Sequence, residues 1–148
     1  MKICTFFGHS IITEDIYSIL LSEIEKLVIN ENVDMFYIGN QGAFDSLSKK
    51  AVCELMKKYT NINYNIVLAY RPSNSENNSV SDFSHTILPE KVALSSPRYS
   101  IVIRNRWMAE RADFIISYII RDFGGAAKAI EFAEKNNKQI INIANHPF

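Results

Sequence analysis

The strongest constraint on the fold comes from five short apolar runs whose residues are continuous rather than alternating with polar ones. Strands that are buried on both faces, as in a parallel sheet covered by helices, have this continuous pattern. The runs therefore predict parallel strands in the interior of an α/β domain. They are ICTFF (3–7), DMFYI (34–38), YNIVLAY (64–70), DFIISYI (113–119) and QIINIA (139–144).

Helical patterns separate these runs. Thr13 is expected to cap the first helix, and Pro97 is expected to begin the third. Because crossovers between parallel strands are right-handed, we expect an α/β fold. It would be a Rossmann-like doubly wound sheet of about five mainly parallel strands, in three α/β/α layers and in the order 3-2-1-4-5. Apolar residues recur at helical spacing in the segments 14–30, 43–59, 98–112 and 125–135.

The chain length suits one domain. Its 148 residues are enough for a single core, so we expect one domain over 1–148. The segment 71–97 interrupts the alternation of strands and helices, because it is polar, rich in Ser and Asn, and without a period. It is expected to be a long loop, of the kind that forms a lid or a binding loop or is disordered.

Composition and charge exclude several classes of protein. The formal net charge is zero, so no overall field favours nucleic acid or an anionic membrane. No apolar stretch is long enough to cross a bilayer, and the first residues lack the length and cleavage site of a signal peptide. Cys4 and Cys53 show no metal-ligand spacing and are expected to be reduced core thiols. These features predict a cytoplasmic protein without a membrane segment, a metal site or a cofactor.

Candidate ligand-binding residues follow the predicted strands. In open α/β sheets, ligands bind beyond the carboxyl ends of the strands, where the strand order reverses. The residues at these positions are Gly8, His9 and Ser10 after the first strand, Gly39, Asn40, Gly42 and Asp45 after the second, Arg71 after the third, and Gly124 and Gly125 after the fourth.

Two glycine-containing turns stand between a strand pattern and a helical pattern. Glycine adopts positive φ and lets another group approach the main chain, while the following helix offers free N–H groups. Gly39 with Gly42, and Gly124 with Gly125, therefore predict two phosphate or carboxylate seats on one rim, which a nucleotide could span. For the first pair, a tight turn with nothing bound is the alternative. Asp45 is expected either to interact with the helix dipole or to hold a ribose hydroxyl.

Arginines are concentrated in the third predicted helix. A guanidinium fork near the anion seats would bind a phosphate at two points, which makes Arg98 and Arg104 candidate ligands. Asn105 is an unusual residue for the middle of a helix and is expected to hydrogen-bond a loop or the ligand. A solvated basic face is the preferred interpretation of Arg106 and Arg111.

Four blocks of the sequence resemble, in order, the SLOG superfamily of Rossmann-like nucleotide-binding domains. The likeness is greatest to small bacterial and phage members. It covers nearly the whole chain, and the segment 71–96 is covered least. The blocks are FFGHS, YIGNQGAFD, RNRWMAERADFIISYI and GGAAKAIEFAEKNNKQIINI.

The resemblance implies an activity as well as a fold. The lonely-guy (LOG) phosphoribohydrolases of this superfamily cleave the N-glycosidic bond of nucleoside 5′-monophosphates. By likeness to their motifs, Arg104 would orient the phosphoribosyl group and Glu131 would be the catalytic carboxylate, as carboxylates are in glycoside cleavage. The chain departs from the motifs at Asn105, which replaces a Lys, and at residues 126–128, which replace x-Gly-Thr. The hydrolytic set is therefore incomplete.

Three functional hypotheses follow. The first is binding of a nucleotide or nucleotide-derived small molecule at the carboxyl rim of the sheet, as a sensor or sequestering domain. The second is a LOG-like N-glycosidic bond hydrolase or transferase acting on a nucleoside monophosphate or dinucleotide through Glu131. The third is a protein-binding or single-stranded DNA-binding module, against which the zero net charge argues. The resemblance alone implies a homodimer.

Overall fold

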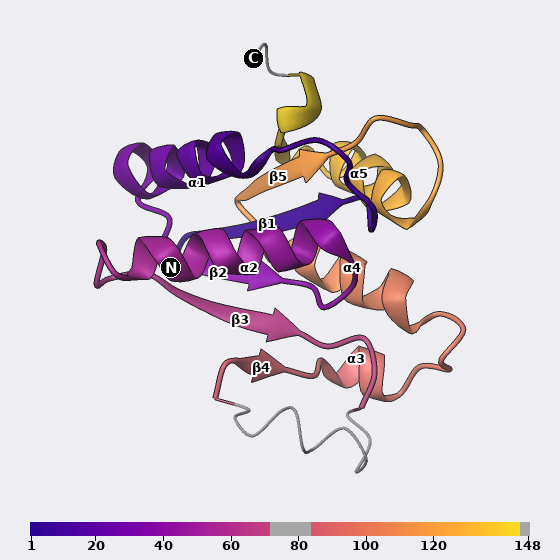
Figure 1. Ribbon diagram of the computed structural model, residues 1–148. Coiled ribbons are helices and arrows are strands. Elements are labelled where there is room, and N and C mark those ends of the chain that lie inside the picture. Colours follow the sequence, from indigo (N-terminus) through magenta and orange to yellow (C-terminus); the bar gives the residue numbers. More distant parts are fainter. Residues whose placement is uncertain (72–83, 146–148) are drawn as a thin grey trace.

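A parallel sheet forms the centre of the molecule. The structure, a computed structural model, describes residues 1–71 and 84–145. The sheet has six strands in the order β4-β3-β2-β1-β5-β6, and each pair of neighbours is parallel (Figure 1). The strands are β1 (Ile3–Gly8), β2 (Met35–Ile38), β3 (Asn63–Val67), β4 (Thr86–Ile87), β5 (Phe114–Tyr118) and β6 (Gln139–Asn142).

Helices cover both faces of the sheet. Successive residues of β1 show the two layers, because Phe6 packs in the core beneath α1 and α2, whereas Phe7 packs in the core beneath α4 and α5. Figure 1 shows α1 and α2 together on one side of the sheet. The predicted three-layer α/β/α fold is therefore confirmed. The helices are α1 (Tyr17–Glu31), α2 (Ala43–Met56), α3 (Glu90–Ala93), α4 (Ser100–Arg111) and α5 (Gly125–Lys135), and a 3₁₀ turn (Ile143–Asn145) follows β6.

The continuous apolar runs have the predicted origin. All five residues of β5 are buried, because this strand lies between β1 and β6 and beneath both helix layers. Residues of β5 alternate between the two cores, with Ile116 on the side of α1 and α2 and Ile115 on the side of α4 and α5. A strand in this position has no solvated face, so its sequence cannot alternate between apolar and polar residues.

The strand order 3-2-1-4-5 is correct for the five predicted strands, and the structure adds one edge strand. The short strand β4 and the short helix α3 both lie within 71–97, so this segment is not the continuous loop that its composition predicts. Residues 72–83 of that predicted loop lie outside the described residues. Two residues are too few to show a strand pattern, and β4 is extended because it pairs with β3.

Two predicted helix starts are wrong. Thr13 does not cap α1. The helix begins at Tyr17, directly after Ile16, and has no side-chain cap. Pro97 is not the first residue of α4, because the helix begins at Ser100, whose hydroxyl donates a hydrogen bond to the Pro97 carbonyl at 3.0 Å. Neither helix has a side-chain cap, and at α1 the residue before the helix, Ile16, is buried in the core.

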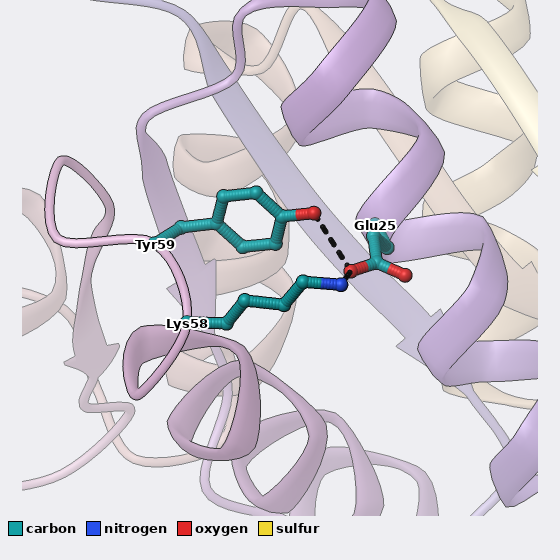
Figure 2. A network of polar contacts seen from close by, with 3 residues as sticks. All are labelled: Glu25, Lys58 and Tyr59. Carbon is teal, nitrogen blue, oxygen red and sulfur yellow. Dashed lines mark hydrogen bonds and ion pairs between the residues drawn. The ribbon is translucent and has the colours of Figure 1, made fainter.

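A polar network ties α1 to the end of α2 on the edge of the sheet opposite to the carboxyl ends of the strands. Glu25 accepts hydrogen bonds from the Tyr59 hydroxyl at 2.8 Å and from the Lys58 ammonium group at 3.0 Å (Figure 2). These two hydrogen bonds to the carboxylate lower the pKa of Glu25. The network joins the two helices at a place remote from the carboxyl ends of the strands.

Two further expectations concern the cysteines and the membrane. Both cysteines are free thiols, and Cys4 is fully buried in the core beneath α1 and α2 while Cys53 is partly buried. Burial raises the pKa of the Cys4 thiol, which is therefore unreactive. Among the described residues, no helix combines the length and the apolar character that a membrane span requires.

Candidate functional site

A cavity of about 180 Å³ lies at the carboxyl end of β1. This is the position at which the sheet order reverses, since β1 has β2 on one side and β5 on the other. Residues from the β1–α1 segment, the turn before α2, the middle of α4 and the turn before α5 surround it. The lining residues are Phe6, Phe7, Gly8, His9, Ser10, Gln41, Asp45, Ile101, Arg104, Asn105, Met108, Arg121, Gly124, Gly125 and Ala126.

The first glycine turn is closed by the protein itself. Gly42 precedes α2 with a φ of 90°, and a Cβ atom built there would lie 2.5 Å from the Ser10 Cα atom. The N–H of Ala43 donates to the Ser10 carbonyl at 2.8 Å, so it is not free for a ligand. The group that approaches the main chain at Gly42 is therefore the β1–α1 segment, and Gly42 does not line the cavity.

At Gly8 and Gly39, neighbouring side chains of the protein also occupy the space that a Cβ atom would need. A Cβ atom on Gly8 would overlap the ring of Phe44. A Cβ atom on Gly39 would lie 2.6 Å from the Asp45 carboxylate and 3.0 Å from Arg104 Nη1. Gly39 thus allows the carboxylate and the guanidinium to approach the main chain from two helices.

The second glycine turn is open. Gly124 precedes α5 with a φ of 100°, and neither Gly124 nor Gly125 has another atom within 4 Å of the position of a Cβ. No side chain caps α5, and its first turn carries no acidic residue. The free N–H groups and the positive end of the α5 dipole are therefore presented to the cavity, as an anion seat requires.

Arg104 is the fixed cation of the cavity. Only 3% of its surface is exposed. Its Nε donates to Asn105 Oδ1 at 2.9 Å, and its Nη1 donates to the Val67 carbonyl at 3.0 Å. Nη2 has no hydrogen-bond partner in the part of the chain that the structure describes. The mid-helix position of Asn105 is thereby explained, since its side chain orients the guanidinium.

Asp45 is the one carboxylate among the lining residues. It accepts a hydrogen bond from the N–H of Gln41 at 2.9 Å. Burial raises the pKa of Asp45 to about 6, although this hydrogen bond and the charge of Arg104 act in the opposite direction. The carboxylate is therefore only weakly held in its charged form near neutral pH.

His9 is a neutral imidazole with a defined tautomer. It is 3% exposed, and its Nε2 accepts a hydrogen bond from the N–H of Ile120 at 2.9 Å. Nδ1 must then carry the ring proton, which makes it a donor beside the cavity. Burial, together with the positive charge of Arg121, lowers the pKa of His9. The edge of the His9 ring packs on Tyr118, whose hydroxyl donates to Glu14.

Several predicted residues lie away from the cavity. Asn40 is exposed and does not line it. Arg71 lines a separate hollow beside α3. Arg98 is exposed and stacks on Tyr99, with the guanidinium carbon 5.5 Å from the ring centroid. Glu131 has a side chain that is 65% exposed and pairs with Lys135 at 3.3 Å on the outer face of α5.

The predicted residues that meet at the cavity are Gly8, His9, Ser10, Asp45, Arg104, Asn105, Gly124 and Gly125. Sequence reasoning did not single out Gln41 and Arg121 as ligand-binding residues. Each lies three residues after the end of a strand, at the carboxyl rim, and this position was the available signal.

Comparison with known proteins supports the fold. No family model matches the chain, and no curated protein matches it in sequence. DNA processing protein A (DprA) from Streptococcus pneumoniae is similar in structure, with a TM-score of 0.68 and 14% identity over 94% of this chain and 49% of that chain. The chain therefore spans about half the length of that protein.

A second solved structure, the molybdenum cofactor carrier protein from Chlamydomonas reinhardtii, has a TM-score of 0.61 and 12% identity. The match covers 99% of this chain and 79% of that protein. The two likenesses show that this chain has a Rossmann-like α/β fold, the fold class that the sequence predicted.

Proposed function

We propose that this chain binds a nucleotide or nucleotide-derived small molecule in the cavity, with a phosphate group at the start of α5. The observation that carries the proposal is the set of donors that converge on one space. The open turn at Gly124 and Gly125, the uncapped helix end and two arginines, Arg104 and Arg121, all line it. The geometry supports an anion there more than any other ligand.

The solved structures support this proposal in general terms. One of them is named as a carrier of the molybdenum cofactor, a small molecule, and the other as a DNA processing protein. Single-stranded DNA binding stays the alternative for that reason. A homodimer, implied by the family resemblance alone, stays a proposal that light scattering on the purified protein would test.

Cleavage through Glu131 is not part of the proposal. The Glu131 carboxylate is exposed, is paired with Lys135, and is not among the cavity-lining residues. A carboxylate that supports cleavage must reach the reacting carbon of the bound sugar. Binding without cleavage is the function that this arrangement supports best.

Two exposed arginines provide a matched test. Arg121 lines the cavity and stacks on Phe123, with its guanidinium carbon 5.2 Å from the ring centroid. Arg98 is equally exposed and stacks on Tyr99 in the same manner, but lies outside the cavity. Arg121→Ala should weaken AMP binding about tenfold, whereas Arg98→Ala should leave it unchanged, because only the first removes a phosphate donor.

Isothermal titration calorimetry with AMP and with adenosine measures both effects. AMP should bind more tightly than adenosine to the parent protein, and this preference should shrink in Arg121→Ala. A ligand at 100 times its Kd adds about 2.7 kcal/mol to the free energy of unfolding, so thermal shifts give an independent readout. Equal binding of AMP and adenosine, or equal losses in the two arginine variants, would contradict the proposal.

A further inference from the structure

A groove of about 310 Å³ runs along the outside of the cavity, between α4 and α5. Its floor is apolar and includes Val102, which is 41% exposed, Ala129 and Phe132. Its sides carry Arg106 and Lys128. A surface that combines a flat aromatic side chain with cations is suited to an aromatic, anionic molecule.

The groove and the cavity are adjacent spaces. Ile101, Asn105 and Gly125 line both of them. Ile101 and Asn105 come from the inner side of α4, and Gly125 is the first residue of α5. The two spaces therefore meet at these three residues, and Gly125, which has no side chain, is the point at which a ligand seated at the start of α5 would enter the groove.

The charges in the groove favour a second anionic group. Three cations line it, and the one carboxylate, Glu131, is paired with Lys135 at 3.3 Å. The guanidinium of Arg106 lies over Phe132, with its carbon 5.4 Å from the ring centroid. The ammonium group of Lys128 makes no hydrogen bond or ion pair with any residue that the structure describes, although its main-chain N–H donates to Gly124 within α5. Two positive charges are thus left without an acidic partner beside the groove.

We propose that the ligand is an extended nucleotide with two phosphate-bearing units, one in the cavity and the second in the groove beside Arg106 and Lys128. This inference rests on the proposed function of the cavity. The length of the groove favours a dinucleotide over a long strand. The residues of α5 that line the groove run from Gly125 to Lys135, and ten steps of about 1.5 Å limit the length of the groove to about 15 Å.

The test compares AMP with pApA, the 5′-phosphorylated adenine dinucleotide, by isothermal titration calorimetry. We expect pApA to bind the parent protein about tenfold more tightly than AMP. Lys128→Glu should abolish this advantage and leave the affinity for AMP unchanged, because Lys128 lines the groove and not the cavity. Lys49→Glu makes the same change in net charge at an exposed position of α2, and is the control.

Glu131→Gln distinguishes a residue that only lines the groove from a catalytic residue. In the groove, loss of its negative charge strengthens pApA binding, by about twofold to fivefold for an exposed charge. A catalytic role instead predicts release of adenine that is lost in this variant.

The outcomes separate the inference from the proposed function. If neither AMP nor pApA binds, the proposed function fails and the inference fails with it. If AMP binds but pApA binds no more tightly, or if Lys128→Glu and Lys49→Glu have equal effects, only the groove is refuted as a second subsite. If oligodeoxyadenylate binds more tightly than pApA and its affinity grows with length, the ligand is single-stranded DNA and the dinucleotide is excluded.

Discussion

Replacing Arg104 by Met should destabilise the fold. The guanidinium makes two buried hydrogen bonds, to the Val67 carbonyl at the end of β3 and to the side chain of Asn105. Both acceptors lie in a region where water cannot replace the donor easily. Arg104→Met keeps the length of the side chain and its apolar stem, so the change removes the charge and the donors with little loss of packing.

The magnitude follows from the two lost donors. A hydrogen bond to a charged group contributes about 1.5–3 kcal/mol. The loss is partly offset because the buried guanidinium is costly to desolvate, a cost that also lowers the pKa of Arg104. A net decrease of about 2–4 kcal/mol in the free energy of unfolding is expected. With a urea dependence of about 2 kcal/mol per molar, the unfolding midpoint falls by about 1–2 M.

Trp107 provides the readout. It is the only tryptophan of the chain, and its ring lies 5.3 Å from that of Tyr37 on β2, so its fluorescence reports the contact between α4 and the sheet. Arg106→Met is the control, because Arg106 is exposed on the same helix and should change the free energy of unfolding by less than about 0.5 kcal/mol. A similar midpoint for both variants would refute the assignment of Arg104 as a buried anchor.

Three further predictions concern two residues that line the cavity and the two glycine turns. The folded-state pKa of Asp45, about 6, lies above its ordinary 3.8, so the folded protein holds the proton more tightly and its stability falls as the pH rises between these values. Asp45→Asn, which keeps an acceptor, should therefore be more stable than the parent at pH 7 and equal to it near pH 4 in urea titrations. A difference in the free energy of unfolding between the two proteins that does not change with pH would contradict this. His9→Phe leaves the N–H of Ile120 without its acceptor, and native-state hydrogen exchange should show faster exchange at that amide. Gly42→Ala should lower the free energy of unfolding by about 1–3 kcal/mol, because it combines a φ of 90° with a contact of 2.5 Å, whereas Gly125→Ala should cost less than about 0.5 kcal/mol. Equal thermal shifts for these two glycine variants would show that the first turn is not packed as described.

The architecture was predictable because parallel strands that are buried on both faces appear in the sequence as continuous apolar runs. The residues of β5 are all apolar or small, and this pattern, with a helix after almost every strand, leaves few topologies. The strand β4 was not predictable, because its two residues are extended only through pairing with β3. The start of α1 was mispredicted at Thr13, because the helix has no side-chain cap and begins after the buried Ile16.

The site was predictable in outline. Position after a strand was enough to place His9, Asp45 and Gly124 at one cavity. The role of each glycine was not predictable. A sequence does not show whether the group that approaches the main chain at a glycine is a ligand or another part of the protein. A Cβ atom on Gly42 would meet the β1–α1 segment, whereas a Cβ atom on Gly124 would meet no atom within 4 Å. Glu131 matched a motif by spacing, yet the start of the helix turns it outward, away from the cavity.

The difference between the two glycine turns has a mechanical consequence. On one side of the cavity, the hydrogen bond from Ala43 to Ser10 joins two connecting segments into a single stiff wall. On the other side, His9 accepts a hydrogen bond from the N–H of Ile120, and the main chain at Gly124 and Gly125 has no atom packed where a Cβ would stand. A guest in the cavity would therefore meet two segments that are bonded to each other on the α2 side, and uncovered main chain on the α5 side.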